Sequence, residues 1–449
     1  MPFGYSDAGM GQGRVYIETW GCQMNLHQSE GIAGVLEREG HTIVDSLDDA
    51  DVVLFNTCSV REKAEAKVIG RIGAVAVAKR SRAVLFGLGG CMAPVHRDSL
   101  LRRFRTIDFL FGTQDLPRLP ALLREVGERG RRADLLPAPQ GLAEVPCRRS
   151  SRVTAMVSIS EGCSTFCSYC IVPFARGPLR SRRPERILAE VEELVRDGTK
   201  EVLLLGQNVD AYGRDEPPFG DFASLLDHVA QTGVRRVRFL TSHPRDLAPQ
   251  VIEAIARHPN VCKHLHLACQ SGSDRVLAAM NRGYTRADFL SIVSRARRAI
   301  PGLRITTDLI VGYPGETQGD LHATLDLVEE VRFGSIFAAK YSPRPGTQSA
   351  RLADDVPEEV KDARLQEVLC RARRIALEEN ERAIGETLDV LVEERTRDGE
   401  GLGRTDDHRT VLFAGSAEPG AFIPIRIESA SASGLRGRAL VAVATEATR

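Results

Sequence analysis

The sequence predicts a multidomain α/β protein with a small doubly wound α/β N-terminal domain, a partial (β/α)6 barrel and a C-terminal small all-β barrel. The first observation is the length of 449 residues, which exceeds what one hydrophobic core organises. The second is that apolar β-like runs alternate with helical stretches through most of the chain. The third is a change after residue 381 to short β-like pieces separated by Gly and Asp turns.

The N-terminal α/β domain is predicted over residues 14–128. A helical stretch from residue 61 to residue 80 separates two of its strands. Repeated strand–helix units favour a parallel sheet, because parallel neighbours require a helical crossover. The four candidate strands are Val15–Thr19, Asp51–Asn56, Ala83–Gly87 and Asp108–Phe111.

Residues 129–150 are rich in Arg, Pro and Gly, have no sustained apolar period, and are predicted to be a linker. Residues 151–381 form the predicted barrel domain, which ends in a long helix over residues 356–380. Functional groups of such barrels lie at the carboxyl ends of the strands. Residues 382–447 form the predicted small β-barrel. The six barrel strands are expected in TAMVSIS, EVLLLGQN, RRVRFLTSHP, HLHLACQSGS, RITTDLIVGYPGE and SIFAAKYSPRPGT.

Composition narrows the class of protein. Lys plus Arg and Asp plus Glu both number 60, so net charge gives no reason to expect a nucleic-acid partner, and only local patches could. No stretch approaches the roughly 20 apolar residues of a membrane helix, and the start of the chain lacks an apolar signal region, so no membrane association and a cytoplasmic location are expected. Ten cysteines are too few for a disulfide scaffold, and grouped cysteines are then metal ligands or catalysts.

Cys163, Cys167 and Cys170 follow the first predicted barrel strand with the spacing C-x3-C-x2-C. A structural zinc site requires four closed ligands, and no fourth Cys or His lies within this loop. Iron–sulfur clusters are held by cysteines, and a cubane with three protein thiolates leaves one iron open to a small molecule. The loop therefore predicts such a cluster, and a zinc knuckle or a set of core thiols is the alternative.

Cys22, Cys58 and Cys91 lie 36 and 33 residues apart, and each follows a predicted strand of the N-terminal domain. Parallel strands bring their carboxyl ends to one edge, so we expect the three thiols to converge as ligands, although each alone would pass for a buried core thiol. Gly21, Gly89 and Gly90 are expected to let the backbone approach a bulky centre, and Asn56 and Thr57 to donate to it. The remaining cysteines are expected to be unrelated thiols: Cys147, Cys262, Cys269 and Cys370.

The cysteine loop, with an aromatic residue before Cys170, resembles the signature of the radical S-adenosylmethionine superfamily. The resemblance implies that Cys163, Cys167 and Cys170 hold a 4Fe-4S cluster whose open iron binds the methionyl group of S-adenosylmethionine, which is cleaved to a 5′-deoxyadenosyl radical. Later strand ends resemble positions that bind this cofactor, with the amide groups of Gln207 and Asn208 at its methionyl end. The corresponding residues are Gln207, Gln270, Ser271 and Asp308.

From about Arg14 to Val443 the chain resembles the methylthiotransferase family, and its last part resembles a TRAM domain, an RNA-binding β-barrel. TWGCQMN at 19–25 and NTCSVREKA at 56–64 favour members that act on isopentenyl (dimethylallyl) adenosine next to the anticodon of tRNA. The resemblance implies two 4Fe-4S clusters, S-adenosylmethionine as methyl donor and radical source, methylthio transfer to C2 of that base, and a reducing electron-donor protein. It implies that the catalytic residues are the ligands Cys22, Cys58, Cys91, Cys163, Cys167 and Cys170.

One departure from the family pattern is Ala268-Cys269, where relatives more often carry Pro and an aliphatic residue. Trp20 is expected to pack against the cluster loop rather than to act chemically. Alternatives are a methylthiotransferase acting on threonylcarbamoyladenosine or on a ribosomal-protein aspartate, and a non-catalytic iron–sulfur or zinc RNA-binding protein. The basic residues expected to contact the tRNA anticodon loop are Arg176, Arg180, Arg182, Arg183, Arg344, Arg395, Arg397, Arg404, Arg409, Arg426, Arg436 and Arg438.

Overall fold

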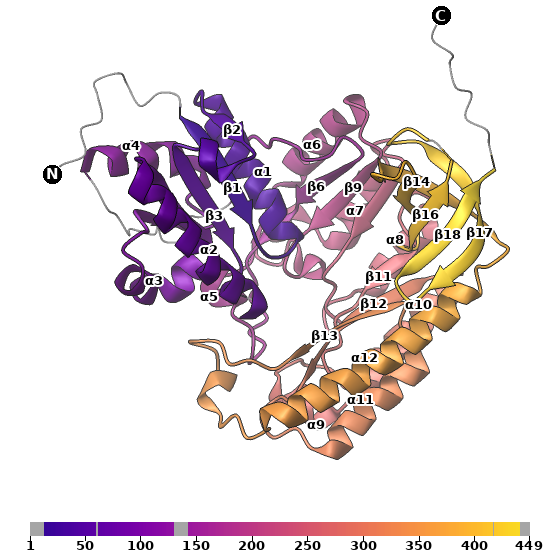
Figure 1. Ribbon diagram of the computed structural model, residues 1–449. Helices are drawn as coiled ribbons and strands as arrows, with labels where there is room; N and C mark the ends of the chain where they lie inside the picture. Colours follow the sequence, from indigo (N-terminus) through magenta and orange to yellow (C-terminus); the bar gives the residue numbers. More distant parts are fainter. Residues whose placement is uncertain (1–12, 60–61, 130–141, 416, 441–449) are drawn as a thin grey trace, which may run out of the picture.

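The computed structural model describes residues 13–59, 62–129, 142–415 and 417–440. Figure 1 shows three units along the chain: an α/β unit near the N-terminus, a central open barrel, and a small β-barrel near the C-terminus. The long helix α12 (Glu358–Glu381) runs along the central unit toward the C-terminal one. In the described ranges, no helix is long and apolar enough to cross a membrane.

The N-terminal unit contains a five-stranded parallel sheet in the order β2-β1-β3-β4-β5. The central strand β3 is buried along its whole length. The predicted parallel sheet is confirmed. The sequence did not predict the edge strand β2, because this strand has only three residues and is partly exposed. The strands are β1 (Arg14–Thr19), β2 (Thr42–Val44), β3 (Val52–Thr57), β4 (Leu85–Gly90) and β5 (Phe109–Phe111).

Helices cover both faces of this sheet, which makes it doubly wound. Phe55 and Phe86 face a core that α2 (Glu62–Ser81) and α3 (Met92–Arg103) complete. Leu54, on the opposite face, packs with α1 (Gln23–Arg38) and α4 (Leu119–Arg129). Side chains of a strand alternate between the two faces, so a strand buried on both sides is apolar throughout, as the VVLF run of β3 is. Trp20 packs edge-on against Phe55 of β3, with ring centroids 4.8 Å apart, so it contributes to the core of the sheet. Its packing against the cluster loop stays a prediction.

The central unit has six parallel strands in chain order, as a partial barrel requires. They form two three-stranded sheets, β10-β9-β6 and β11-β12-β13, and the isolated parallel bridges Val237–Val261 and Ser242–Leu267 join the two sheets. One hydrophobic core fills the space between the strands and their helices. The strands are β6 (Thr154–Ser158), β9 (Glu201–Leu205), β10 (Arg236–Phe239), β11 (His264–His266), β12 (Arg304–Val311) and β13 (Ser335–Lys340).

The helices of the central unit follow the strands, and two of them begin at capping residues that the sequence supplies. Thr285 caps α10 and Thr317 caps α11, and in each helix an aspartate three residues later returns a hydrogen bond to the cap. A short antiparallel hairpin, β7 (Ser160–Glu161) with β8 (Arg180–Ser181), encloses the cysteine loop and α5 (Val172–Arg176). The other helices are α6 (Pro184–Arg196), α7 (Phe222–Ala230), α8 (Pro249–Arg257), α9 (Asp274–Ala279), α10 (Arg286–Ala299) and α11 (Gln318–Val331).

The C-terminal unit is a closed five-stranded barrel in the order β14-β15-β16-β18-β17, around its own apolar core. The sequence did not predict β15, and the predicted last strand extends beyond the described residues, which end at residue 440. The strands are β14 (Thr387–Arg395), β15 (Gly401–Arg404), β16 (Thr410–Ala414), β17 (Phe422–Ser431) and β18 (Gly434–Ala439).

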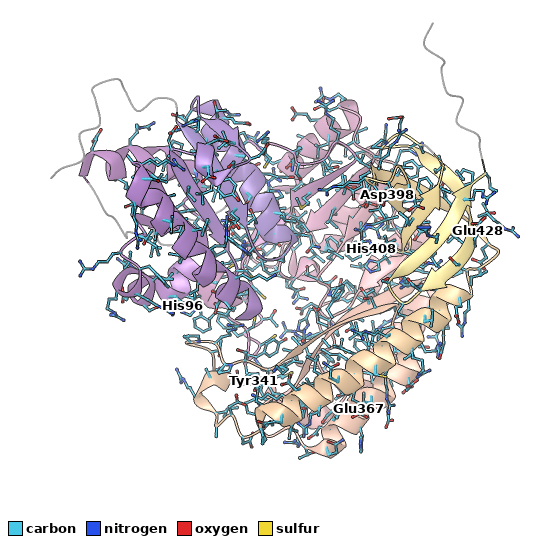
Figure 2. The ribbon with its side chains drawn as sticks, viewed as in Figure 1. His96, Tyr341, Glu367, Asp398, His408 and Glu428 are labelled. Atoms are coloured by element: carbon cyan, nitrogen blue, oxygen red, sulfur yellow. The ribbon has the colours of Figure 1, made fainter. Side chains whose placement is uncertain are left out.

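The C-terminal barrel is docked on the amino ends of the central strands. At the start of β10, Arg236 Nη1 donates to the carbonyl oxygen of Arg404 at 2.9 Å, and Arg238 Nη2 donates to that of Thr405 at 3.2 Å. His264, which begins β11, stacks on His408 with ring centroids 4.8 Å apart. Figure 2 shows His408 on the side of the C-terminal barrel that faces the central unit. The C-terminal barrel therefore occupies one end of the central strands and leaves the carboxyl end for the predicted site.

Candidate active site

The barrel cysteines lie in a loop that is fixed at both ends. Cys163 donates its backbone N–H to the carbonyl of Gly177 at 3.1 Å, and Ser168 donates its own to the carbonyl of Met280 at 3.0 Å. Gly162 has φ +79°, and a β-carbon there would lie 2.0 Å from the Pro178 carbonyl oxygen, so only glycine fits. The backbone thus sets the cysteines before any cofactor binds.

The structure brings the three thiols of this loop together. Burial, together with the negative charges of the neighbouring Cys167 and Cys163, raises the pKa of Cys170 to about 12. Protonated thiols at this site make poor ligands, so cluster assembly requires positive charge to compensate the thiolates. In the described part of the chain, no three His, Cys, Asp or Glu side chains meet closely enough to hold a single metal ion. In a four-iron cubane each cysteine binds its own iron, and the loop suits that arrangement.

Arg282 supplies that positive charge, and no pattern in the sequence indicates it. Its side chain is 3% exposed, and Nη1 donates to Sγ of Cys167 at 3.3 Å and to the hydroxyl of Tyr169 at 3.4 Å. Nη2 donates to the carbonyl of Ala268, on the neighbouring strand end. The guanidinium therefore connects the cysteine loop to the strand end after β11.

The predicted cofactor residues lie at neighbouring strand ends, but they differ in which polar groups are available to bind a cofactor. Gln207 accepts a hydrogen bond from the N–H of Gly162, and its buried Nε2 has no partner among the described residues. Asp308 shares a hydrogen bond with His266 at 3.2 Å and is 38% exposed at the side chain. Gln270 has φ +69° and joins the strand end of β12 through its backbone. The Ser271 hydroxyl accepts from the N–H of Ser273 and shares a hydrogen bond with the hydroxyl of Thr324 on α11.

A polar network that the sequence did not predict lies beside Gln207. Asn208 Nδ2 donates to Asp246 at 2.6 Å, and Arg214 donates to the same carboxylate at 2.6 Å. Burial opposes the charge of Asp246, but hydrogen bonds from Arg245, Arg214 and Asn208 lower its pKa to about 2. Burial raises the pKa of the neighbouring Asp210 to about 7. These groups follow β9 and β10, so they form part of the same barrel mouth.

The chain segments that carry the cysteines of the N-terminal unit meet at one edge of its sheet, and the role of these cysteines as ligands stays a prediction. Cys22 precedes α1 and is exposed, whereas Cys58 and Cys91 follow β3 and β4 and are buried. These cysteines follow three adjacent strands, with the register pairing Thr57 with Gly90 at the edge. A β-carbon on Gly21 would lie 2.8 Å from Cβ of Cys58, and Cys91 donates its N–H to the Thr57 carbonyl at 2.8 Å. Three chain segments thus meet at one point of the sheet edge.

The residues flanking these cysteines play a different part from the predicted one. Asn56 donates to the carbonyl of Asn25 at 2.8 Å, and the Thr57 hydroxyl donates to the carbonyl of Gly89, so neither amide nor hydroxyl is free to donate to a thiolate. A β-carbon on Gly89 would overlap the ring of Phe111, at 2.2 Å. The prediction is therefore wrong for Asn56 and Thr57, which bond the strand ends together, because buried polar groups at a sheet edge need partners. For Gly21, Gly89 and Gly90 it stays a prediction.

Arg176 lies between the two cysteine sets. It ends α5, six residues after Cys170, and its Nη1 donates to Glu161 at 3.1 Å. Burial opposes its charge, but Cys91, Glu161 and Cys22 raise its pKa above the ordinary value. Helix α5 also packs on α3, which begins immediately after Cys91. The two sets therefore flank one short helix, although they belong to separate parts of the chain.

Several arginines predicted to contact RNA are buried in ion pairs, and the prediction is wrong for them. Arg176 and Arg180 both bind Glu161, and Arg182 binds Glu144 and Glu190. Arg344 is 8% exposed and binds Glu65 at 3.2 Å. In the C-terminal barrel, Arg409 is mostly buried and binds Asp407. Arg404 binds Glu393 but keeps 36% of its side chain exposed, so its contact with RNA stays a prediction. Five arginines of that barrel remain exposed: Arg395, Arg397, Arg426, Arg436 and Arg438.

The remaining cysteines do not join either set. Cys262 and Cys269 are buried in the central unit, and Cys370 is exposed on α12. Cys147 lies in the described part of the linker, and burial raises its pKa to about 11. Their expected lack of a role stays a prediction.

Three family patterns match the chain. The uncharacterized protein family UPF0004 matches residues 14–112, the radical SAM superfamily matches residues 157–328, and the TRAM domain matches residues 381–440. Among solved structures, the chain is similar to the radical S-adenosylmethionine methyltransferase TsrM from Kitasatospora setae, with a TM-score of 0.58, 14% identity, and 84% of this chain and 78% of that one covered. The cobalamin-dependent enzyme OxsB gives a TM-score of 0.52 at 13% identity, with coverage of 80% and 56%. These two likenesses concern the fold.

Curated relatives match over nearly the whole chain. The tRNA-2-methylthio-N(6)-dimethylallyladenosine synthase of Carboxydothermus hydrogenoformans is 44% identical, with 95% of this chain and 99% of the relative covered. The enzyme of the same name from Geobacter metallireducens is 42% identical, with coverage of 96% and 99%. That of Nitrosospira multiformis is 44% identical, with coverage of 94% and 92%. The chain therefore belongs to the tRNA-2-methylthio-N(6)-dimethylallyladenosine synthase family of radical S-adenosylmethionine methylthiotransferases.

Proposed function

We propose that this enzyme transfers a methylthio group to C2 of N6-isopentenyl (dimethylallyl) adenosine next to the anticodon of tRNA, with S-adenosylmethionine as methyl donor and radical source. The observation that carries the proposal is the convergence of two separate three-cysteine sets on either side of α5. A C2–H bond of adenine offers no acidic proton to a side-chain base, so the reaction requires more than acid–base chemistry. Two adjacent metal clusters meet that requirement.

Cys163, Cys167 and Cys170 are the proposed ligands of one 4Fe-4S cluster, which together with S-adenosylmethionine supplies the 5′-deoxyadenosyl radical when bound. Arg282 compensates the charge of Cys167 through its hydrogen bond of 3.3 Å. The loop backbone holds the ligands in place without help from the cofactor.

The cofactor contacts are assigned to the strand ends of the barrel mouth. Gln207 has an unpartnered buried amide nitrogen, which fits the carboxylate of the methionyl group. Asp308, partly exposed and held by His266, fits a ribose hydroxyl. Gln270 and Ser271 shape the intervening loop, Gln270 with its positive φ and Ser271 with its internal hydrogen bond.

Cys22, Cys58 and Cys91 are the proposed ligands of the second cluster, where the sulfur to be transferred is held. Cys58 and Cys91 are buried against the sheet edge, whereas Cys22 is exposed, so the cluster has one open side. The nearby charge of Arg176 offsets the negative charge of the thiolates. Both clusters require electrons, which a reducing partner protein supplies.

The tRNA anticodon loop is the proposed macromolecular substrate. Bases of a loop unstack more easily than those of a duplex, so C2 can enter the barrel mouth. The exposed arginines of the C-terminal barrel are available for phosphates, among them Arg426 and Arg438. Because Arg176, Arg180 and Arg182 are buried in ion pairs, phosphate binding is assigned to the C-terminal barrel rather than to the cysteine loop.

The test is an anaerobic assay of the reconstituted holoenzyme with S-adenosylmethionine, a reductant and tRNA that carries isopentenyladenosine. Mass spectrometry of the nucleosides should show the 2-methylthio derivative, and tRNA with unmodified adenosine should give none. Iron analysis should give about eight iron atoms per chain, falling to about four when Cys22, Cys58 and Cys91 are all replaced by alanine. Methylthio product on threonylcarbamoyladenosine or on a protein aspartate, with none on isopentenyladenosine, would contradict the assignment.

A further inference from the structure

The short helix α5 carries a half-exposed aromatic ring, that of Phe174, which is 51% exposed. The other residues of the helix are buried or partly buried: Val172, Pro173, Ala175 and Arg176. A single exposed apolar side chain is common in folded proteins, so exposure alone implies no function. What distinguishes Phe174 is the set of groups that surround it.

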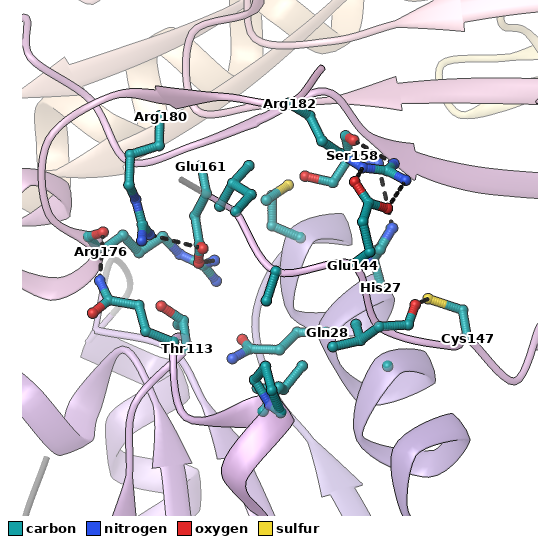
Figure 3. A pocket seen from close by; sticks show the side chains of 18 of the residues that line it. His27, Gln28, Thr113, Glu144, Cys147, Ser158, Glu161, Arg176, Arg180 and Arg182 are labelled. Carbon is teal, nitrogen blue, oxygen red and sulfur yellow. Dashed lines mark hydrogen bonds and ion pairs between the residues drawn. The ribbon is translucent and has the colours of Figure 1, made fainter. Parts of the chain in front are cut away.

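The backbone of α5 is fixed, so the ring of Phe174 stands on a rigid base. Phe174 donates its N–H to the carbonyl of Ile171 at 3.0 Å. Gln114 Nε2, from the N-terminal unit, donates to the carbonyl of Arg176 at 3.2 Å. On the buried side of the helix the guanidinium of Arg176 points to Glu161, as Figure 3 shows. A platform held in this way loses little conformational freedom when a ligand binds to its exposed side.

A second segment of the barrel mouth lies beside this ring. It is the loop after β13, in which Pro345 and Gly346 are exposed. A β-carbon on Gly346 would lie 3.9 Å from Cδ1 of Phe174, which is ordinary van der Waals contact. Arg344 anchors the loop to the N-terminal unit, because its Nη1 donates to Glu65 at 3.2 Å. Phe174, Pro345 and Gly346 thus form an exposed apolar corner whose two segments are each held in place.

The position of the apolar corner relates it to both cysteine sets. Cys170 lies four residues before Phe174 in the chain. Arg176 lies two residues after it and interacts electrostatically with Cys91 and Cys22. Helix α5 also packs on α3, the helix that begins directly after Cys91, and Figure 1 shows the two side by side. A group bound on Phe174 is therefore close to both sets.

The proposed reaction requires a base to be held at such a place. C2 of the adenine has to be reached both by the radical formed at the barrel cluster and by sulfur held at the N-terminal cluster, so the base has to lie between the two. Adenine is planar and stacks on aromatic side chains, and its isopentenyl group is apolar. We infer that the ring of isopentenyladenine stacks on Phe174, with its isopentenyl group against Pro345 and Gly346. This inference rests on the proposed function, and it assigns the residues that hold the base.

The test compares two variants of the reconstituted holoenzyme on tRNA that carries isopentenyladenosine. Phe174→Leu keeps an apolar side chain but removes the ring, and it should lower kcat/KM for the methylthio product by about tenfold or more. Phe174→Tyr keeps the ring and should stay within about twofold of the wild type. Product from Phe174→Leu at the wild-type rate would overturn the inference. Equal losses in the two variants would overturn it too, because the ring would then not be the group that matters.

A second readout separates a misplaced base from a damaged cluster. The amount of 5′-deoxyadenosine formed per methylthio product should rise about tenfold in Phe174→Leu, because radicals then form while the base is out of place. This ratio does not depend on how much cluster a preparation of the enzyme holds. A higher KM for S-adenosylmethionine in Phe174→Leu, measured without tRNA, would overturn the inference, since the ring would then bind the cofactor instead of the base.

Phe104→Leu is the matched control, because the partly exposed Phe104 follows the end of α3 that is distant from Cys91. It should make methylthio product as the wild type does, and a loss equal to that of Phe174→Leu would overturn the inference. If the wild type makes no methylthio product on this tRNA, the proposed function fails and the inference fails with it. Product from the wild type together with an unimpaired Phe174→Leu overturns the inference alone.

Discussion

Arg282 donates a hydrogen bond from Nη1 to Sγ of Cys167 at 3.3 Å, although 115 residues separate the two in the chain. The guanidinium is buried, so it acts at short range and with little screening by solvent. A fixed positive charge beside a cluster ligand stabilises the more negative, reduced state of the cluster.

Arg282→Gln should therefore lower the reduction potential of the barrel cluster and slow formation of 5′-deoxyadenosine by at least tenfold. Redox titration followed by electron paramagnetic resonance measures the potential, in a background where Cys22, Cys58 and Cys91 are alanine. Arg275→Gln is the control, because Arg275 is a surface residue paired with Asp320. An unchanged potential in Arg282→Gln would show that the contact is only structural.

The two cysteine sets should divide the chemistry between them. Cys22→Ser should abolish the methylthio product but retain cleavage of S-adenosylmethionine, because the barrel loop does not depend on Cys22. Cys167→Ser should abolish both products, since it removes a ligand of the barrel cluster. Chromatography of 5′-deoxyadenosine and mass spectrometry of the tRNA nucleosides separate the two outcomes. Full methylthio product from Cys22→Ser would show that the N-terminal set is dispensable.

Gly162 should be far less tolerant of substitution than other glycines with positive φ. Gly162→Ala places a β-carbon 2.0 Å from the Pro178 carbonyl oxygen, so the cysteine loop has to shift. Gly198 has φ +93°, and a β-carbon at this position would have no atom within 4 Å. Gly198→Ala therefore introduces only backbone strain of about 1 kcal/mol. We expect Gly162→Ala to lose about half the iron and Gly198→Ala to keep it. Equal iron content in the two variants would contradict the role assigned to the loop.

Docking of the C-terminal barrel should weaken in acid. Burial lowers the pKa of His408 to about 2, and burial lowers that of His264 well below its usual range. Both imidazoles are neutral in the folded protein and take up protons below about pH 6.5 once unfolded. Folding stability therefore falls as the pH drops below about 6.5, by up to about 1.4 kcal/mol per pH unit for each histidine.

The measurement is the free energy of unfolding between pH 7.5 and 5.5, for the wild type and for His264→Gln with His408→Gln. The double variant should lose stability less steeply, because it removes two of the groups that bind protons only on unfolding. Limited proteolysis should release the C-terminal barrel from the wild type earlier at pH 5.5 than at pH 7.5. Equal slopes for the two proteins would contradict the explanation.

The strands that position the site could be predicted, because an apolar run bounded by glycine or polar residues is a local signal. The runs before Cys58 and Cys163 are of this kind. Strand β15, with the sequence GLGR, has little β propensity of its own and forms because its neighbours pair with it. The short edge strand β2 escaped prediction for a similar reason.

The electrostatic partners could not be predicted, because they are distant in sequence. Arg176 and Arg180 resemble a basic surface patch, and only the fold places both on Glu161. Arg282 gives no local signal at all, since its partner Cys167 lies in another strand–helix unit. The placement of the cysteines at strand ends was predictable, because each follows an apolar run. The hydrogen bonds of Asn56 and Thr57 were not, because an amide or hydroxyl group can bond in several directions.

The docking of the C-terminal barrel at the amino end of the central strands has a geometric consequence for the RNA. Strand β12 has eight residues, so the two ends of the barrel are separated by about 25 Å. An RNA that places a base in the mouth and phosphates on the C-terminal barrel has to extend along the outside of the molecule over that distance. In the proposed mode of binding, recognition therefore depends on the length of the RNA as well as on the identity of one base.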